Sequence, residues 1–130
     1  MMGRQDPKIL VGVDIVEIAR IKMVVERTPR FLTRVFTPQE LDYCSRKKDP
    51  YPSLAVRFAA REAVRKLDPA FIKGVGFQDT EVILDKNGRP QIVLHGAALE
   101  RAQKAGVSQI SVSLSHSKEQ AIAMVVANKG

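Results

Sequence analysis

The chain has 130 residues, of which 45% are hydrophobic and 27% charged, a balance typical of a globular domain rather than a disordered chain. It contains no run of about 18 apolar residues, so we expect no membrane span, and Met1 to Lys8 lacks the apolar stretch of a secretory signal. The net charge of +7 predicts an anionic partner without choosing among nucleic acid, membrane surface, acidic protein and phosphorylated ligand.

The first half of the chain predicts one strand and three helices. Ile9–Val13 is an apolar run that predicts a buried strand ending at Asp14, and apolar residues at 15, 18, 21 and 25 predict a helix over Ile15–Glu26. Residues 37–40, Thr-Pro-Gln-Glu, form a capping box that predicts a helix to about residue 45. Residues 53 to about 67 are rich in Ala, Leu, Arg and Glu and predict the third helix.

The second half predicts two strand pairs separated by a helix. Glu81–Leu84 and Gln91–Leu94 are short strands joined by a turn that contains Asn87-Gly88. Gly106 stops a helix over Ala97–Ala105. Ser108–His116 and Ala121–Ala127 are the last two predicted strands. The mixed order of helices and strands predicts an α+β fold in a single domain over residues 1–130.

Two carboxylates are candidates for a metal site, and each has a structural alternative. Asp14 follows a strand and could point into a cleft, or it could cap the helix that is expected to begin at Ile15. Glu62 lies four residues before Lys66 on one helix face, where the pair could form an ordinary surface ion pair. Alternatively, Asp14 and Glu62 could hold Mg²⁺, which prefers one or two carboxylates together with phosphate oxygens. Arg57 and its neighbours on the same helix would then offset phosphate charge.

Histidine and cysteine add weaker candidates. Strand alternation places His116 on the face of Ile110, Val112 and Leu114, which favours a buried, hydrogen-bonded histidine, although the end of a strand also lets a side chain reach a ligand. His95 begins a helix and is expected to be structural or exposed. Cys44 is the only cysteine, which excludes an intrachain disulfide, and we expect a small buried residue rather than a nucleophile.

Three sequence blocks occur in order along the chain and share one pattern. They are VGVDIVEIARI at residues 11–21, RFAAREAVRK at residues 57–66 and VSLSHS at residues 112–117. FTPQEL at residues 36–41 adds a fourth. Together these blocks resemble the holo-acyl-carrier-protein synthase family of phosphopantetheinyl transferases, and the resemblance spans nearly the whole chain. It implies the family's fold, an antiparallel sheet packed with helices.

The resemblance also implies a set of site residues. Asp14 and Glu62 match the residues that bind Mg²⁺ together with the pyrophosphate of coenzyme A. Lys66 matches a phosphate-binding lysine. His116 matches a histidine near the reacting phosphate or the 3'-phosphate region of coenzyme A, and Arg57 matches a further contact to coenzyme A. Glu62, Lys66 and His116 are therefore the expected catalytic residues.

The implied reaction transfers 4'-phosphopantetheine from coenzyme A to a serine of apo acyl carrier protein, in support of fatty acid biosynthesis, and it releases 3',5'-ADP. The general base could be a metal-bound water or His116. Arg20, Arg27 and Arg30 match the region where the family docks the acidic helix of its carrier protein. The resemblance further implies a homotrimer with active sites at subunit interfaces. We also expect a cytoplasmic protein with no nucleic-acid or membrane partner.

One departure and one rival hypothesis accompany this resemblance. Arg61 stands where the family usually has Lys, so a planar fork replaces a point charge next to Glu62. The rival is a binding module without catalysis, in which basic helices hold an acidic protein or RNA, Asp14 is a helix cap, and Glu62 and Lys66 are surface charges. Such a module would bind its partner without Mg²⁺ or coenzyme A.

Overall fold

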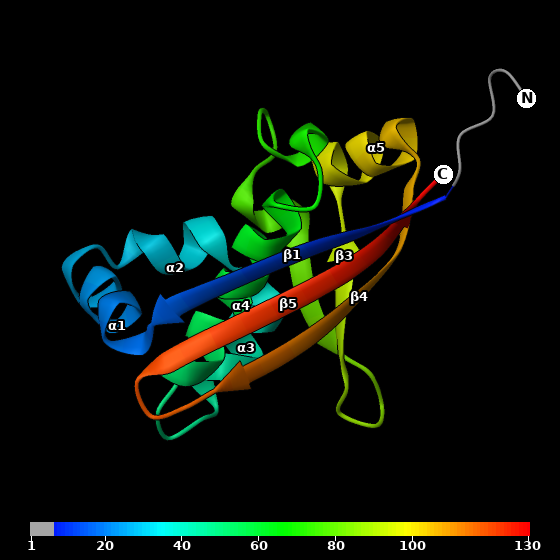
Figure 1. Ribbon diagram of the computed structural model, residues 1–130. Coiled ribbons are helices and arrows are strands. Elements are labelled where there is room, and N and C mark those ends of the chain that lie inside the picture. The colour runs from blue at the N-terminus through cyan, green and yellow to red at the C-terminus, as the bar shows by residue number, and fades with distance from the viewer. Residues whose placement is uncertain (1–6) are drawn as a thin grey trace, which may run out of the picture.

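The structure is a computed structural model that describes residues 7–130 (Figure 1). The N-terminal stretch in which no secretory signal is expected therefore lies outside the described residues, except for Pro7 and Lys8. Within residues 7–130 no helix is both long enough and apolar enough to cross a membrane.

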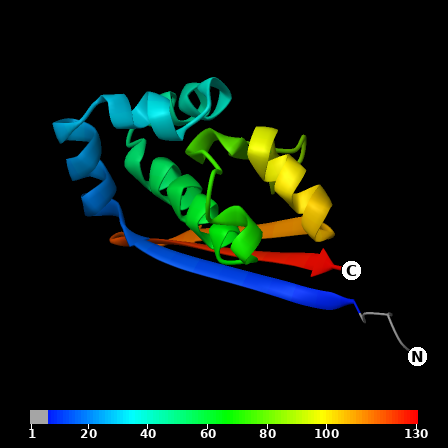
Figure 2. The ribbon, with the colours of Figure 1, turned by 90° about the horizontal axis from the view of Figure 1, so that it is seen from above.

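Two antiparallel sheets carry the fold. The larger has the strand order β1-β5-β4, and the smaller is the hairpin β2-β3. Figure 2 shows the helices on one side of the larger sheet, and none of the described elements covers its other face, which we call the bare face. This arrangement confirms the predicted α+β class. The strands are β1 (Lys8–Glu17), β2 (Thr80–Leu84), β3 (Pro90–Leu94), β4 (Val107–His116) and β5 (Gln120–Lys129), and the helices are α1 (Ile18–Arg27), α2 (Arg30–Val35), α3 (Pro38–Ser45), α4 (Tyr51–Arg65) and α5 (Gly96–Ala105), with short 3₁₀ turns at Pro69–Phe71 and Phe77–Asp79.

Most elements lie within two or three residues of their predicted bounds. The capping box of α3 is present, because the Thr37 side chain accepts a hydrogen bond from the Glu40 amide and the Glu40 side chain accepts one from the Thr37 amide. Gly106 follows α5 in the left-handed conformation, with φ of 72°. The short helix α2, which begins directly after Pro29, was not predicted.

The prediction of a helix from Ile15 is wrong. β1 continues to Glu17, where its pairing with β5 matches Glu17 to Gln120, and α1 begins only at Ile18. The buried apolar residues of α1 are Ile18, Ile21 and Val25, which is the predicted spacing without its first member. Pairing with β5 holds Ile15 in the strand, so the β-branched residues at the boundary extend the sheet. Asp14 is therefore not a helix cap.

Helix α4 lies at the centre of the molecule and packs unusually close to β1. It contributes to both hydrophobic clusters, through alanines at 55, 59, 60 and 63 that are completely buried. A Cβ atom placed on Gly12 would lie 2.0 Å from the carbonyl oxygen of Ala63. Small residues on both elements therefore permit a backbone contact that any side chain at Gly12 would obstruct.

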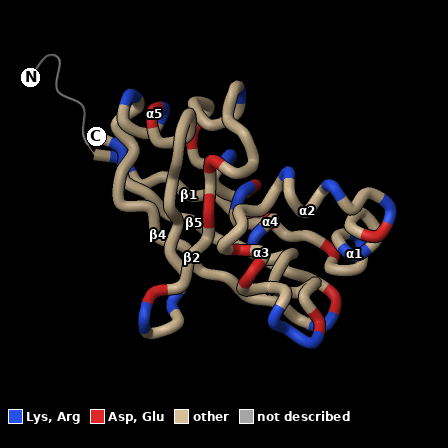
Figure 3. Tube along the Cα trace, turned by 180° about the vertical axis from the view of Figure 1, so that it is seen from behind, with Lys and Arg blue, Asp and Glu red and all other residues tan. Residues whose placement is uncertain are grey.

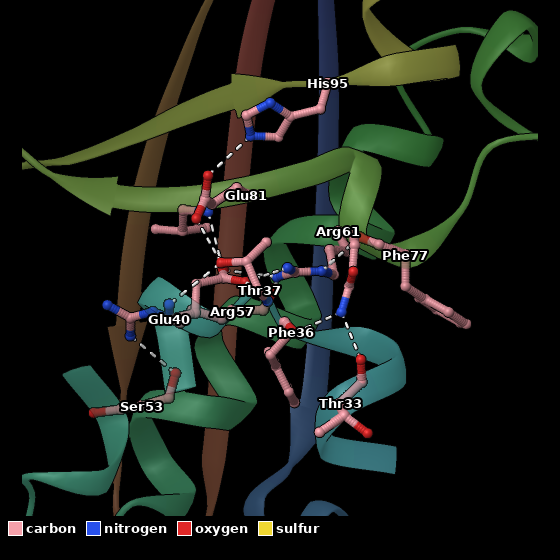
Figure 4. A network of polar contacts seen from close by, with 12 residues as sticks. Thr33, Phe36, Thr37, Glu40, Ser53, Arg57, Arg61, Phe77, Glu81 and His95 are labelled. Atoms are coloured by element: carbon pink, nitrogen blue, oxygen red, sulfur yellow. Dashed lines mark hydrogen bonds and ion pairs between the residues drawn. The ribbon is translucent and has the colours of Figure 1, made fainter. Parts of the chain in front are cut away.

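A buried ion pair fixes the opposite side of α4 to α3 and the hairpin (Figure 4). The Arg61 guanidinium donates to both carboxylate oxygens of Glu40, and these side chains are 2% and 0% exposed. Glu40 also accepts a hydrogen bond of 3.0 Å from the amide of Val82 in β2. Arg61 donates to the carbonyl of Phe77 at 2.8 Å. Because every partner is satisfied, this buried charge pair fixes the relative positions of three elements.

Glu81 extends the same network to the surface. Its carboxylate accepts hydrogen bonds from Thr37 and from Nε2 of His95, the latter at 2.9 Å. Burial raises the pKa of the Glu81 carboxyl, but these hydrogen bonds outweigh burial and leave the pKa below its ordinary value. The His95 side chain is 49% exposed, so this residue is structural and partly exposed, as predicted.

We expect the replacement of Gly12 by Ala to destabilise the protein by about 3 kcal/mol, because the new methyl group would force β1 away from the Ala63 carbonyl. Urea unfolding would measure the change in the free energy of unfolding. Gly76→Ala is the matched control, since a Cβ atom there meets Asp79 only at 3.7 Å. Equal losses in the two variants would contradict the proposed contact.

Candidate active site

Asp14 and Glu62, which are 48 positions apart in the sequence, line one cavity of about 310 Å³. Arg20 and an apolar wall complete its lining, and the wall contains Ile15, Val16, Ile21, Val24, Phe31 and Phe58. The structure therefore brings together the two carboxylates that were predicted from separate sequence blocks.

The packing of α4 on β1 explains why these two side chains meet. Alternation along β1 turns Gly12 and Asp14 toward the helices and leaves Val13 facing outward. Gly12 contacts Ala63, the residue after Glu62, so Asp14 lies two positions along the same strand face from that contact. Side chains held by a strand and a packed helix are positioned more rigidly than side chains on loops.

The electrostatic state of Glu62 fits a bound cation. Its side chain is 34% exposed, but its Oε2 atom is buried and has no hydrogen-bond partner within the described part of the chain. The closest cationic group is Nε of Arg65, at 3.7 Å, which is too far for a hydrogen bond. An unpartnered buried carboxylate oxygen is costly and favours a cation, and two carboxylates are the number that Mg²⁺ commonly uses. Within residues 7–130 no group of three acidic, histidine or cysteine side chains is placed to hold a metal ion.

Lys66 does not form the expected surface ion pair with Glu62. Its ammonium instead donates to the Asp14 carboxylate at 3.0 Å and to the backbone carbonyl of Val13 at 2.9 Å. The Asp14 side chain is 18% exposed and that of Lys66 is 54% exposed. Lys66 therefore belongs to the same charged cluster as Asp14, through a contact that joins α4 to β1.

Arg57 lies in a separate cavity of about 430 Å³ on the α3 side of α4. Arg57 is 4% exposed and its guanidinium lies 4.5 Å from the centre of the Tyr43 ring. Its Nη1 donates to the Ser53 carbonyl, whereas its buried Nε has no hydrogen-bond partner among the described residues. Arg46 and Lys47 also line this cavity, together with Asp42, which pairs with Arg46 at 2.7 Å, and Glu40, which pairs with Arg61. Arg57 and Lys47 are therefore the lining cations that remain to attract an anion.

Arg61, the position at which the sequence departs from the resemblance, has a structural role. Its guanidinium is held by Glu40 and the Phe77 carbonyl, and its side chain is 2% exposed. The fork geometry of Arg suits this two-oxygen contact, which a Lys ammonium would not reproduce. The two neighbouring positions therefore point to different places, Arg61 into the network and Glu62 into the cavity.

His116 lies apart from the carboxylate cavity of its own chain and is exposed. The expectation that it is buried is wrong, because β4 ends at His116 and the residue extends past the cover of the helices. Its Nδ1 lies 3.2 Å from the Ser117 carbonyl. Its register partner in β5 is Ala121, and Ala121 in turn pairs with Val16 of β1, so β5 separates His116 from β1.

Arg20, Arg27 and Arg30 are exposed, and the helices that carry them, α1 and α2, lie at one end of the molecule (Figure 3). Arg20 also lines the carboxylate cavity, whereas Arg27 closes α1 and Arg30 begins α2. Sequence reasoning did not identify the aromatic wall of this cavity. Phe31 and Phe58 have ring centroids 5.8 Å apart, and the position of Phe58 four residues before Glu62 is the signal that could have identified it.

Cys44 is 1% exposed, as expected for a small core residue. Burial raises the pKa of its thiol above the ordinary value, which keeps the sulfur protonated. The position of Cys44 therefore offers no nucleophile.

Comparison with known proteins places this geometry in a family. Residues 10–125 match the family model of the 4'-phosphopantetheinyl transferase superfamily. A holo-[acyl-carrier-protein] synthase of Dehalococcoides mccartyi is 50% identical over 117 residues, which cover 89% of this chain and 95% of that protein.

Two solved structures share the fold as well. The ACPS–CoA complex of Chronobacterium ammoniagenes superposes with a TM-score of 0.83 at 28% identity and covers 95% of this chain and 98% of its own. The Helicobacter pylori holo-[acyl-carrier-protein] synthase in complex with coenzyme A has a TM-score of 0.75 at 31% identity, with coverage of 91% and 99%. The chain belongs to the 4'-phosphopantetheinyl transferase superfamily.

Proposed function

We propose that the chain is a magnesium-dependent holo-[acyl-carrier-protein] synthase. It transfers 4'-phosphopantetheine from coenzyme A to a serine of apo acyl carrier protein. The serine oxygen forms a bond to the β-phosphorus of coenzyme A, the bond to the bridging pyrophosphate oxygen breaks, and 3',5'-ADP leaves. The observation that carries this proposal is the cavity that holds Asp14 and Glu62 together, with one buried Glu62 oxygen that accepts no hydrogen bond from the described residues. Holo acyl carrier protein then serves fatty acid biosynthesis.

Asp14 and Glu62 are the proposed Mg²⁺ ligands, and the donor set fits. Both provide hard carboxylate oxygens, and the cavity leaves space for phosphate oxygens and water to complete the coordination. When bound, the metal ion stabilises negative charge on the pyrophosphate of the leaving group. Lys66, beside Asp14, provides a positive charge for the phosphates.

Arg57 and His116 are the proposed additional contacts to coenzyme A. The Nε of Arg57, which has no hydrogen-bond partner among the described residues, can donate to a phosphate oxygen, and Lys47 lines the same cavity. His116 is exposed at the end of β4, where its imidazole can contact a ligand or take the serine proton. In its own chain it lies outside the carboxylate cavity, which fits a role at the site of a neighbouring subunit.

The bare face of the sheet supports a homotrimer with active sites at the subunit interfaces. On this face the side chains of Ile9, Val11, Val13 and Ile15 in β1 are 48–72% exposed, and Ile122 and Met124 in β5 are 38% and 44% exposed. A contiguous exposed apolar surface of this kind is typical of an interface between proteins. We infer that further copies of the chain cover it, and that this assembly works in the cytoplasm, where the free thiol of Cys44 stays reduced.

The first test is transfer itself, measured as the increase in mass of apo acyl carrier protein incubated with coenzyme A and Mg²⁺. We expect Glu62→Gln to reduce the rate at saturating Mg²⁺ by about a hundredfold or more, because it removes the charge that holds the metal. Glu100→Gln is the matched control, since Glu100 is an exposed helix residue paired with Lys104. Wild-type transfer by Glu62→Gln would refute the metal assignment, and the non-catalytic binding module predicts no increase in mass at all.

Carrier-protein docking predicts a selective kinetic effect. Arg20→Glu and Arg27→Glu should raise the KM for acyl carrier protein by about tenfold and leave the KM for coenzyme A within about twofold, because they reverse charge on the face of α1 that meets the acidic partner. Arg27 gives the cleaner test, since Arg20 also lines the cavity. Lys104→Glu, on α5, controls for the change in net charge. Equal increases in the KM for acyl carrier protein and the KM for coenzyme A would contradict the docking hypothesis.

The homotrimer predicts that Val11→Lys, on the bare sheet face, yields monomers in analytical ultracentrifugation and loses transfer. Leu99→Lys is the control, because Leu99 is an exposed apolar residue of α5, away from that face. A wild-type protein that sediments as a monomer with full activity would refute the shared active site.

A further inference from the structure

Each carboxylate of the candidate site already has a cationic neighbour from the same helix, but the two contacts differ. Asp14 is hydrogen-bonded to the Lys66 ammonium at 3.0 Å. Glu62 is 3.7 Å from Arg65 and keeps one buried oxygen without a hydrogen bond among the described residues. The charge of Asp14 is therefore neutralised by a hydrogen-bonded Lys66, whereas the charge of Glu62 is compensated only by the more distant Arg65.

The contact between Lys66 and Asp14 conflicts with cation binding at the same carboxylate. An ion bound to Asp14 would lie close to an ammonium that donates to Oδ1, and two like charges repel strongly at such a separation. Mg²⁺ also requires near-octahedral geometry, whereas the Lys ammonium sits on a flexible stem and can donate in several directions. Lys66 is the group that can move.

The surroundings of Lys66 leave its side chain space to move away from Asp14. Its side chain is 54% exposed and begins at the C-terminal cap of α4, where no further turn of helix covers it. Its second contact is the neutral carbonyl of Val13, so the Asp14 pair is the only charged contact that the described chain gives it. The Lys66 side of this ion pair is exposed to solvent, which screens the interaction and limits its contribution to stability.

We propose that Lys66 is an exchangeable counterion of Asp14, whose ammonium leaves the carboxylate when a divalent cation binds there and then contacts the phosphates of coenzyme A. This inference rests on the proposed function and adds to it that Lys66 competes with the metal. The Lys66 ammonium thus binds first the Asp14 carboxylate and then the phosphates of coenzyme A. Metal binding and the availability of Lys66 to phosphate are coupled, because a divalent cation on Asp14 repels the ammonium on Oδ1 and weakens the attraction between the carboxylate and Lys66.

Binding of Mn²⁺, used as a paramagnetic probe of the divalent site and counted by electron paramagnetic resonance, tests the competition without any turnover. We expect Lys66→Met to bind Mn²⁺ about fivefold more tightly than the wild type, because Asp14 is released from its partner. Lys66→Gln should behave in the same way and guards against a packing defect specific to Met.

Two control variants separate exchange from a general change in charge. Lys104→Met removes the same charge from a Lys–Glu pair on α5 and should stay within about twofold of the wild type. Arg65→Met removes the cation beside Glu62, which makes no hydrogen bond to that carboxylate. The increase in Mn²⁺ affinity should be clearly smaller in Arg65→Met than in Lys66→Met. Unchanged affinity in both Lys66 variants, or equal gains in Arg65→Met and Lys66→Met, would overturn the exchange.

Asp14→Asn distinguishes this inference from the proposed function. If Asp14→Asn binds Mn²⁺ as the wild type does, the metal assignment itself fails. If Asp14→Asn loses Mn²⁺ while the Lys66 variants bind it as the wild type does, only the exchange fails.

Isothermal titration of coenzyme A with and without Mg²⁺ then tests where Lys66 goes. The gain in coenzyme A affinity from Mg²⁺ should be at least about threefold larger in the wild type than in Lys66→Met. Equal gains would show that the released ammonium does not contact the phosphates.

Discussion

The contact between the Gly12 backbone and the Ala63 carbonyl is the constraint on which the site depends. It lets α4 lie against β1 with no side chain between them at that point, so the two elements have one relative position. Asp14 follows Gly12 on the same strand face, and Glu62 precedes Ala63 on the helix. A small displacement of the helix would change the separation of the two carboxylates, and a metal site tolerates little change of that kind. The glycine in the first sequence block is thus a structural requirement of the carboxylate pair.

The ion pair between Glu40 and Arg61 fixes the position of α4 on the side that faces away from β1. It ties the helix to α3, while the Val82 amide on Glu40 adds the hairpin. Isolated buried charges are costly, but here the guanidinium and the carboxylate satisfy one another and nearby backbone groups, so the arrangement is specific. As a consequence, adjacent residues of one helix have separate roles. Arg61 fixes the helix, and Glu62 faces the cavity that the fixed helix creates.

Local signals in the sequence predicted most helices and strands. The features that sequence analysis did not predict depend on contacts between residues far apart in the chain. The capping box of α3 and the glycine after α5 act within a few residues, so their patterns were sufficient. The boundary between β1 and α1 was misplaced because pairing with β5, about a hundred residues away, keeps Ile15 in the strand. The partner of Lys66 was also missed, because helical spacing suggested Glu62 while the fold places Asp14 within reach. The meeting of Asp14 and Glu62 followed only from the family resemblance, since no local pattern links them.

The net charge of +7 predicted an anionic partner of unspecified class, and the structure divides this charge among groups with different roles. Arg61 is neutralised in the interior, and Lys129 binds Asp68 at 2.7 Å, where it holds the 3₁₀ turn after α4 to β5. These cations are structural and add little to the external field. Exposed arginines of α1 and α2 provide that field beside the cavity, where it can attract an acidic protein and a polyphosphate to one place. Lys66 belongs to neither group, because it is paired with Asp14 but remains exposed. A cation in this position can neutralise Asp14 before the metal ion binds and contact the phosphates of coenzyme A afterwards.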